Sequence, residues 1–316
     1  MDLSEKSETG KGPSSTPRVL LIGKDGPIEG TIEQALTGLD CSFARAHGSA
    51  DALRQLRETP FAVVITDPDS SMREDLALLD EIRHVRPGVR VIMLASEGTP
   101  EDLIEALRQR TFLCQVAPFK SREIARYAVS AIKADDPADG IDVISANRSW
   151  VSVRMNCSIL NADRLTAFFH QFRKTVPDPA PEEMLIAFEE ILNNAVEHGA
   201  HNDPSKLIEV AAVRTARAFV FYVSDPGKGF RQDAIPHAAI SYAPAYVTRH
   251  LEVRDAAGMR PGGYGMLLAK GIVDELIYSD VGNEVLLIKH MDVPDHDQGW
   301  TDQEHHSGIA RSGPSC

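Results

Sequence analysis

Cysteine is scarce in this sequence, and the few cysteines stand far apart. Cys41, Cys114, Cys157 and Cys316 have no near neighbour of their own kind, so the paired spacing that holds a metal ion is absent. They are typical of ordinary thiols in a reducing compartment.

Long hydrophobic runs and a secretory signal are missing as well. The longest apolar runs are only as long as a β-strand, so no membrane-spanning helix is expected. The chain starts with MDLSEKSETG, which is polar and acidic, unlike a signal peptide. We therefore expect a cytoplasmic protein that has no membrane partner.

Positive charge is also in short supply. Lys and Arg number 33 against 46 Asp and Glu, and the net charge of −13 argues against a nucleic-acid surface, which normally carries a basic patch. The residues that are present, 43% hydrophobic and 25% charged, form the composition of a globular protein. A chain of 316 residues can build two domains, each with its own core.

Local composition divides the chain into two folded domains. Residues 1–17 lack periodicity and are expected to form a disordered leader, and the polar residues 292–316 are expected to form a disordered tail. An acidic segment with Pro and Gly at 134–148 is predicted to link a domain at 18–133 to a domain at 149–291.

In the first domain, short apolar runs alternate with segments of helical period. This alternation predicts an α/β fold with a doubly wound parallel sheet, whose functional residues follow the carboxyl ends of the strands. The expected strands are 19–22, 42–46, 62–66, 89–94 and 112–116, and the expected helices are 31–36, 50–57, 76–84, 101–108 and 121–133.

Asp67 directly follows the third expected strand, and the next expected helix and turn read LLDEIRHVRPG at 78–88. In these features the first 130 or so residues resemble a response-regulator receiver domain. The resemblance implies that Asp67 is the residue that would accept a phosphoryl group.

The residues that support a receiver's acceptor are largely missing. A receiver holds Mg²⁺ with two carboxylates after its first strand, but Gly23 and Lys24 stand there. Ala95 and Ala117 stand where a receiver has a hydroxyl residue and a lysine. We therefore favour a pseudo-receiver that serves docking or homodimerisation over a phosphorylation switch at Asp67.

The second domain contains an expected helix with a line of polar residues. Apolar residues recur at helical spacing over 181–198, and Glu190, Asn194 and His198 stack along one side at i, i+4 and i+8. A solvated helix face is the plain alternative for such a line. The other expected elements are an edge strand at 149–155, strands at 207–213 and 218–224, helices at 163–174 and 265–274, and a hairpin of 275–278 with 285–289.

Two glycine motifs accompany this helix. The first is DPGKG at 225–229, directly after an expected strand, and the second is GGYG at 262–265, at the start of an expected helix. Between them, 231–260 has little periodicity and is long enough for a functional lid. A phosphate loop of the type GxxxxGK[ST] is absent from the sequence, so it offers no competing phosphate site.

In this order and spacing, the helix and the two motifs resemble the ATP-binding domain of the GHKL superfamily, which includes gyrase, heat-shock chaperones, histidine kinases and mismatch-repair ATPases. The resemblance covers nearly all of 150–290. It is closest to the anti-sigma-factor serine/threonine kinases, through the segments 193–199, 271–276 and 282–285. It implies an α/β sandwich of the histidine-kinase-like ATPase type, with ATP and Mg²⁺ as cofactors.

The chemistry of the residues agrees with this resemblance. Asn194 offers an amide oxygen to Mg²⁺, and Glu190, one helical turn earlier, can orient or deprotonate an attacking hydroxyl. The resemblance implies that Asp225 accepts a hydrogen bond from the adenine amino group. His198 either contributes to the nucleotide site or packs, and Asn283 stands where many relatives have threonine, which leaves one contact near the phosphates open.

The glycines of the two motifs allow close approach. Gly227 and Gly229 leave room for the base and ribose. Gly263 and Gly265 allow backbone N–H groups at a helix N-terminus to meet the phosphates.

These observations favour a partner-switching serine/threonine kinase, which phosphorylates an anti-sigma-factor antagonist and sequesters a sigma factor or similar target. A nucleotide-gated binding module without transfer activity is the alternative from another class. Glu190 favours the kinase, because binding alone requires no base. A hybrid histidine kinase fits worse, because the interval between the domains is too short for a dimerising two-helix unit. His84 and His170 lie within the two domains and not in such a unit.

Overall fold

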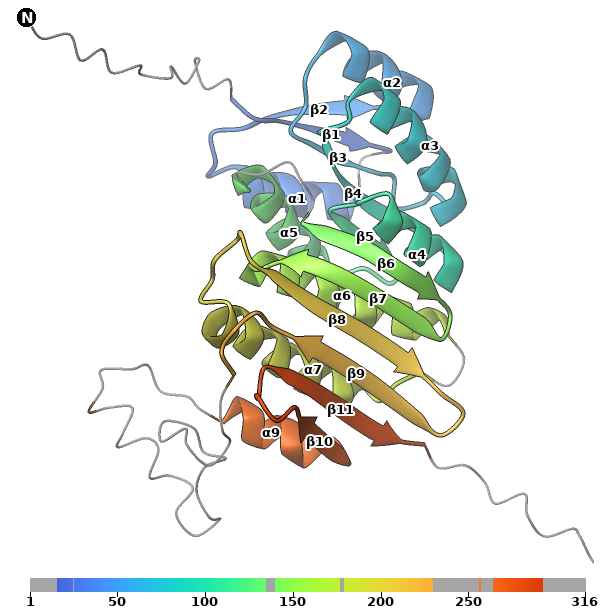
Figure 1. Cartoon of the computed structure of the whole chain (residues 1–316). Coiled ribbons are helices and arrows are strands. Elements are labelled where there is room, and N and C mark those ends of the chain that lie inside the picture. The colour runs from blue at the N-terminus through green and yellow to red at the C-terminus, as the bar shows by residue number, and fades with distance from the viewer. Residues whose placement is uncertain are drawn as a thin grey trace, which may run out of the picture.

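The computed structural model describes residues 16–24, 26–134, 140–176, 179–229, 256 and 264–291. They form two domains, each built on a sheet of its own (Figure 1). Outside the described residues lie the predicted tail at 292–316, all but the end of the predicted leader at 1–17, and all but Ala256 of the predicted lid at 231–260.

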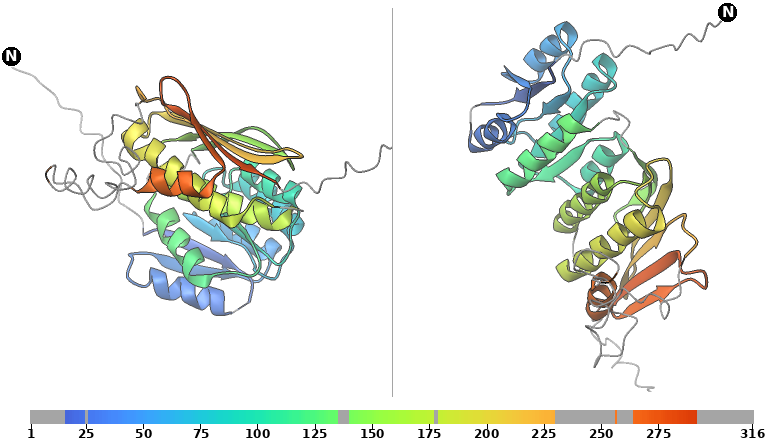
Figure 2. Two further views of the ribbon diagram at one scale, coloured as in Figure 1. Left: turned by 90° about the horizontal axis from the view of Figure 1, so that it is seen from below. Right: turned by 90° about the vertical axis from the view of Figure 1, so that its left-hand side faces the viewer.

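The first domain is a five-stranded parallel sheet in the order β2-β1-β3-β4-β5. Helices α1 and α5 pack together on one face, and α2, α3 and α4 cover the other (Figures 1 and 2). The predicted doubly wound parallel sheet is confirmed. Its elements are β1 (Arg18–Ile22), α1 (Pro27–Leu36), β2 (Ser42–Ala46), α2 (Ser49–Glu58), β3 (Val63–Ile65), α3 (Met72–Val85), β4 (Arg90–Ala95), α4 (Pro100–Arg108), β5 (Leu113–Val116) and α5 (Ser121–Lys133).

Two of these helices begin about a turn earlier than the apolar period indicated. α1 begins with Pro27, whose fixed φ suits the first helical position. The start of α3 is set by a reciprocal capping box between Ser71 and Glu74. Both first turns contain polar residues, so the apolar period starts only after them.

The second domain is a six-stranded antiparallel sheet in the order β10-β11-β9-β8-β7-β6. Its helices α6, α7 and α9 lie on one face of the sheet (Figure 2). The predicted α/β sandwich is confirmed. The elements are β6 (Ile141–Asn147), β7 (Trp150–Asn156), α6 (Ile159–Thr175), α7 (Glu182–Asn194), a π-helical turn η1 (Ala195–Gly199), β8 (Leu207–Arg214), β9 (Ala218–Ser224), α9 (Gly265–Ile272), β10 (Glu275–Tyr278) and β11 (Glu284–His290).

The predicted linker at 134–148 is wrong in its second half. Residues 141–147 form β6, which pairs with β7 and is the edge strand, so the predicted edge strand at 149–155 lies one place inside the sheet. The register shifts between Val143 and Ser145, which breaks the alternation of buried and exposed residues. Ile144 consequently faces solvent, and no regular strand pattern could be read from this segment.

The predicted α-helix at 181–198 also needs correction. The α-helix ends at Asn194, and residues 195–199 form the π turn, in which the Ala200 N–H donates to the carbonyl of Ala195. A π turn winds less tightly than an α turn. Glu190 and Asn194 therefore keep their α-helical stacking, whereas His198 does not continue their line.

An aromatic cluster anchors α7 to the sheet. The ring of Phe188, which is fully buried, stacks on Phe221 of β9 at a centroid distance of 4.3 Å. Phe169 of α6 meets both rings edge-on, at 5.4 Å from Phe188 and 5.2 Å from Phe221. These contacts hold α6, α7 and the sheet in one position.

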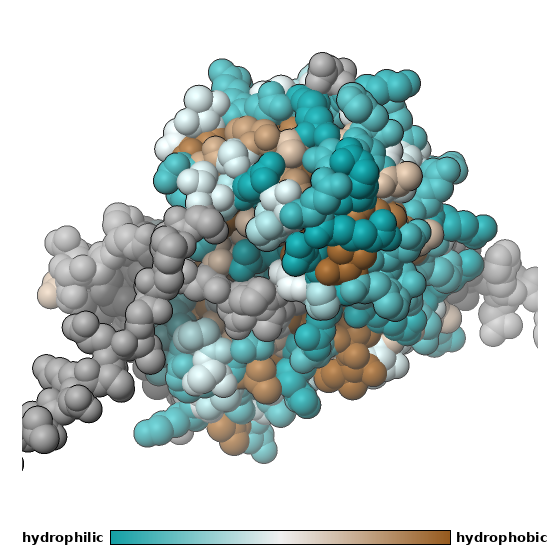
Figure 3. All heavy atoms as spheres, turned by 90° about the horizontal axis from the view of Figure 1, so that it is seen from above, coloured by the Kyte–Doolittle hydropathy of each residue, from teal (hydrophilic) through white to brown (hydrophobic). Residues whose placement is uncertain are grey.

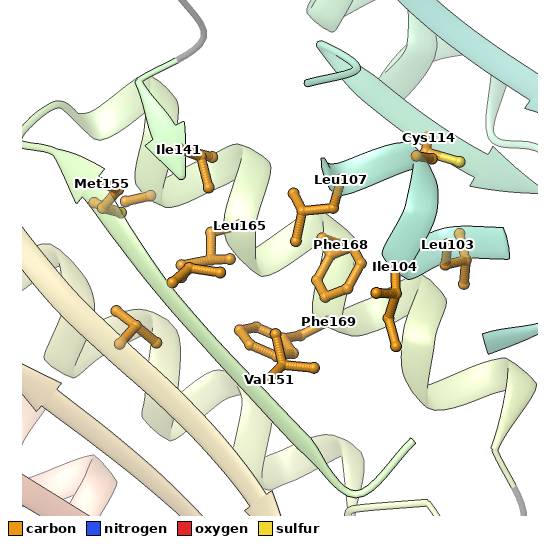
Figure 4. Packing of buried hydrophobic residues seen from close by; sticks show 14 of the residues in the cluster. Leu103, Ile104, Leu107, Cys114, Ile141, Val151, Met155, Leu165, Phe168 and Phe169 are labelled. Atoms are coloured by element: carbon orange, nitrogen blue, oxygen red, sulfur yellow. The ribbon is translucent and has the colours of Figure 1, made fainter. Parts of the chain in front are cut away.

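Helix α6 also packs against the first domain, and the cores of the two domains are continuous there (Figure 4). Phe168 points toward Ile104 and Leu107 of α4, while its neighbour Phe169 points toward the sheet (Figure 4). The backbone N–H of Val116, on the edge strand β5, donates to the buried Gln171 side chain of α6 at 3.2 Å. One helix of the second domain thus covers the sheet edge of the first.

Arg164 of α6 is a buried charged residue at this interface, with 6% of its surface exposed. Its guanidinium donates to the carbonyls of Phe112 at 2.7 Å and Thr111 at 3.1 Å, and to the Asn161 side chain at 3.0 Å. It also lies 4.5 Å from the centre of the Phe112 ring. Arg164 was not predicted, because nothing in the local sequence distinguishes it from a surface arginine.

The end of the molecule formed by the first domain is mostly hydrophilic, with only separate small hydrophobic patches (Figure 3). Within the part of the chain that the structure describes, no helix has both the length and the apolar character needed to span a membrane.

Candidate functional site

A cavity of about 820 Å³ lies at the C-terminal end of α7. Its walls come from α7, the π turn, the loop after β9, the start of α9 and the β10–β11 turn. Every predicted site residue of this domain except Gly263, which is outside the described residues, lines it: Glu190, Asn194, Asp225, Gly227, Gly229 and Gly265.

Glu190 and Asn194 form one wall, held in place by buried residues on the opposite side of α7. The start of α9 lies directly against them. A Cβ atom at Gly265 would collide with the carboxylate of Glu190 and would lie 3.7 Å from the Asn194 amide nitrogen. The absence of a side chain at 265 thus lets the start of α9 lie directly against the carboxylate of Glu190.

The N-terminus of α9 suits an anion. Tyr264, at the capping position, makes no side-chain hydrogen bond to the first turn, and that turn contains no acidic residue. The first N–H groups of a helix lack partners within it, and the helix dipole favours negative charge there. A phosphate group placed at this end would lie beside Glu190 and Asn194.

Asp225 lies on the other side of the cavity, in a tight cradle. The Gly227 N–H donates to its carboxylate at 2.8 Å, and a side chain at either Gly199 or Gly227 would collide with that carboxylate. Burial raises the pKa of Asp225 above its ordinary value, and the Gly227 N–H and the nearby His201 oppose this rise. Gly199 was expected only to end the helix. Because it has no side chain, it also allows the Asp225 carboxylate to pack against its backbone.

Several lining residues were not predicted. His201, Lys206 and Tyr278 border the cavity, but His201 and Lys206 lie in the turn before β8 and Tyr278 lies on β10, with no local pattern that marks them. His198 also lines the cavity, and its side chain is exposed.

In the first domain, Asp67 follows β3 as expected, but its surroundings differ from those of a metal-assisted acceptor. Its carboxylate lies so close to Gly23 that a Cβ atom there would be 2.8 Å from the carboxyl carbon. The Asp69 N–H donates to the same carboxylate at 2.9 Å, and the Ser96 hydroxyl is turned to the Ser70 carbonyl at 2.9 Å. Among the described residues, no three metal-binding side chains gather anywhere.

We accordingly expect Asp67 to remain unmodified when the protein is incubated with acetyl phosphate and Mg²⁺. Gly23 and Lys24, the described residues directly after β1, offer no carboxylate to a metal ion, so the charge of an incoming phosphoryl group would be poorly offset. Intact-protein mass spectrometry measures the added mass, with an Asp67→Asn variant as the control. Stable, Asp67-dependent phosphorylation would contradict the pseudo-receiver interpretation.

Fold and site together define two classes of domain. The strand order 2-1-3-4-5 with alternating helices is that of CheY-like receivers. The second domain pairs an antiparallel sheet with a cavity built from helix, strand-end and glycine motifs, as in histidine-kinase-like ATPases.

Comparison with known proteins agrees with this assignment. Residues 159–289 match the family described as the histidine kinase-like ATPase domain. The chain is similar to the transcriptional regulatory protein GlrR of Escherichia coli K12, with 27% identity over 120 residues, which are 38% of this chain and 27% of that protein. It is 31% identical over 90 residues to the transcriptional regulatory protein ZraR of Salmonella typhimurium, covering 28% of this chain and 20% of that one. This chain thus spans less than a third of the length of either relative.

Two solved structures are also similar to it. A CheY-like response regulator receiver domain from Methanospirillum hungatei has 19% identity and a TM-score of 0.33, covering 37% of this chain and 94% of that one. A response regulator receiver domain from Clostridium thermocellum has 24% identity and a TM-score of 0.32, covering 37% and 94%.

By its strand order the N-terminal domain is receiver-like, and residues 159–289 form a domain that matches the histidine kinase-like ATPase family. An ATPase domain implies ATP binding, and the combination of the two domains is that of a signalling protein.

Proposed function

We propose that this protein is an ATP-dependent serine/threonine protein kinase of the anti-sigma-factor type. The observation that carries the proposal is the single cavity lined by residues from three separate segments, with a carboxylate and an amide at one end and a cradled aspartate at the other. A site that only bound a nucleotide would not need the carboxylate beside its phosphate end.

The residues present fit Mg²⁺ and ATP. The Asn194 amide oxygen is a hard neutral ligand of the kind Mg²⁺ accepts, and the N-terminus of α9, whose first turn contains no acidic residue, suits phosphates. The glycines at 199, 227 and 265 let the backbone lie directly against the carboxylates of Asp225 and Glu190, both of which line the cavity. When bound, ATP supplies the phosphoryl group and Mg²⁺ neutralises part of its charge.

The protein's own groups then have separate tasks. Asp225 accepts a hydrogen bond from the adenine amino group, and its cradle fixes the carboxylate for that contact. Asn194 holds the metal ion. Glu190 orients the attacking hydroxyl of a substrate serine and takes up its proton.

The proposed substrate is a serine of an anti-sigma-factor antagonist, and the proposed second partner is a sigma factor or similar regulator. This rests on the resemblance of 193–199, 271–276 and 282–285 to the anti-sigma-factor kinases. A pull-down with ATP or ADP present, followed by mass spectrometry of the bound proteins and their phosphoserines, identifies both partners.

A hybrid histidine kinase is disfavoured by the chain between the domains. α5 ends at Lys133 and β6 begins at Ile141, so the interval cannot hold two dimerising helices. His84 lies on α3 of the first domain and His170 on α6 of the second.

Replacement of Glu190 by glutamine should leave nucleotide binding intact but slow phosphoryl transfer to the captured partner by ~10²–10⁴-fold, since the amide cannot accept the proton. Calorimetry measures binding, and radiolabelled ATP measures transfer. Glu189→Gln is the matched control, because Glu189 is a half-buried neighbour that does not line the cavity. Unchanged transfer in Glu190→Gln would remove the base from the mechanism and favour the nucleotide-gated binding module.

A further inference from the structure

We propose that Asn283 is a positioning residue that holds Asp225 in the orientation needed to select the base of the nucleotide. This inference rests on the proposed nucleotide binding and deepens it. It assigns a task to the position where many relatives have threonine.

Asn283 holds Asp225 by its backbone on both sides. The Asp225 N–H donates to the Asn283 carbonyl at 3.0 Å, and the Asn283 side-chain amide donates to the Asp225 carbonyl at 3.1 Å. The first bond continues the ladder between β9 and β11, whose last strand pair is Ser224 with Glu284. The second bond is an addition that only the side chain supplies.

Backbone restraint decides where the carboxylate of Asp225 points. An aspartate side chain has few staggered rotamers, so a fixed backbone limits its carboxylate to a few positions. The close packing of Gly199 and Gly227 against the carboxylate reduces these further. A contact that discriminates between bases requires this accuracy, because a displacement of about 1 Å can cost a large factor in recognition.

The turn that carries Asn283 is itself well ordered. The Ser279 N–H donates to the Glu284 carbonyl at 2.9 Å, and the Gly282 N–H donates to the Ser279 hydroxyl at 3.2 Å. Gly282 has a φ of +86°, a conformation that glycine adopts without strain. These bonds hold the backbone of Asn283 in place, so its side chain starts from a fixed position.

The same β10–β11 turn also supports the C-terminal end of the 225–229 loop. Gly229, with a φ of +71°, lies so close to the Val281 carbonyl that any side chain there would collide with it. The β10–β11 turn thus contacts the 225–229 loop at its first residue through Asn283 and at its last through Val281. The turn therefore holds the 225–229 loop at both of its ends.

The hydrogen bond from the Asn283 side chain to the Asp225 carbonyl requires an N–H donor on Cγ, at the distance from the backbone that an asparagine amide provides. Threonine carries its hydroxyl on Cβ, one bond closer to the backbone, and aspartate of the same shape has no N–H to donate. Both substitutions should therefore break the bond to the Asp225 carbonyl while leaving the backbone ladder in place. The proposal can be tested with these variants as well as with alanine.

The test measures base preference by calorimetry with the full chain, Mg²⁺ and either ADP or inosine diphosphate, which has a carbonyl in place of the adenine amino group. In Asn283→Ala and Asn283→Asp we expect ADP affinity to fall about tenfold, which corresponds to a lost hydrogen bond of about 1.4 kcal/mol. Inosine diphosphate, which has no amino group to donate to Asp225, should bind each variant within about twofold of its affinity for wild type. The preference for ADP should therefore fall by nearly the same factor.

Ser279→Ala is the matched control, since it removes a hydrogen bond from the same turn without touching Asp225. It should keep both affinity and preference. If the Asn283 variants lost affinity for both nucleotides equally, Asn283 would be only structural and the inference would be overturned. Wild type that binds ADP without base preference would overturn it too, whereas wild type that binds no nucleotide would overturn the proposed function itself.

Discussion

Replacement of Asn194 by alanine is expected to abolish Mg²⁺-dependent ATP binding. Asn194 lines the cavity beside Glu190 and the N-terminus of α9, where the phosphates and their metal ion would lie. Alanine removes the amide oxygen and places an apolar methyl group next to the metal position. Since loss of even an outer-shell partner of a bound metal costs 10–100-fold, loss of a direct ligand should weaken binding by at least about 100-fold.

Isothermal titration calorimetry with ATP and Mg²⁺ measures this effect, and a repeat with EDTA shows the part that depends on the metal. Asn193→Ala is the matched control. Asn193 is the same residue type one position earlier, and among the described residues it does not line the cavity and its buried side-chain oxygen has no hydrogen-bond partner. Loss of affinity in both variants would indicate damage to α7, and unchanged affinity in Asn194→Ala would refute the nucleotide assignment.

Replacement of Arg164 by alanine should destabilise the two domains together. Its guanidinium is buried between them and donates hydrogen bonds to the carbonyls of Thr111 and Phe112 and to the side chain of Asn161. Removal leaves these acceptors buried without their donor and opens a cavity, at a cost of about 3–5 kcal/mol in the free energy of unfolding.

Urea unfolding can follow both domains at once. Circular dichroism reports the whole chain, while among the described residues Trp150, on β7, is the tryptophan whose fluorescence reports the second domain. The two transitions should coincide in wild type and shift together in Arg164→Ala. Arg148→Ala, which breaks an exposed ion pair with Glu101 across the same interface, should leave the midpoint near that of wild type. Separate transitions in wild type, or a midpoint unchanged in Arg164→Ala, would show that the domains fold independently.

The shared interface gives α6 a central place between the two domains. One side of the helix meets α4 and β5 through Phe168 and Arg164, and the other meets α7 through Phe169. α7 carries Glu190 and Asn194. A change in the first domain that moved α6 would therefore act on the helix that lines the cavity.

The sequence by itself determined those features that depend on neighbours along the chain. Apolar runs and helical periods reflect which face of each element is buried, so they predicted the parallel sheet of the first domain and most elements of the second. The spacing of Glu190 and Asn194 depends on a single α-helical turn. The strand-end position of Asp225 and the helix-start position of Gly265 are equally local.

Tertiary structure alone decided which of these pieces meet, because such contacts join residues far apart in the chain. β6 is recruited as an edge strand although its bulge breaks the local alternation. The π turn that ends α7 brings Gly199 against Asp225, and Asn283 bonds to Asp225 across 58 positions. The polar helix face that could have been merely solvated became a wall of a cavity because α9 and the loop after β9 close over it.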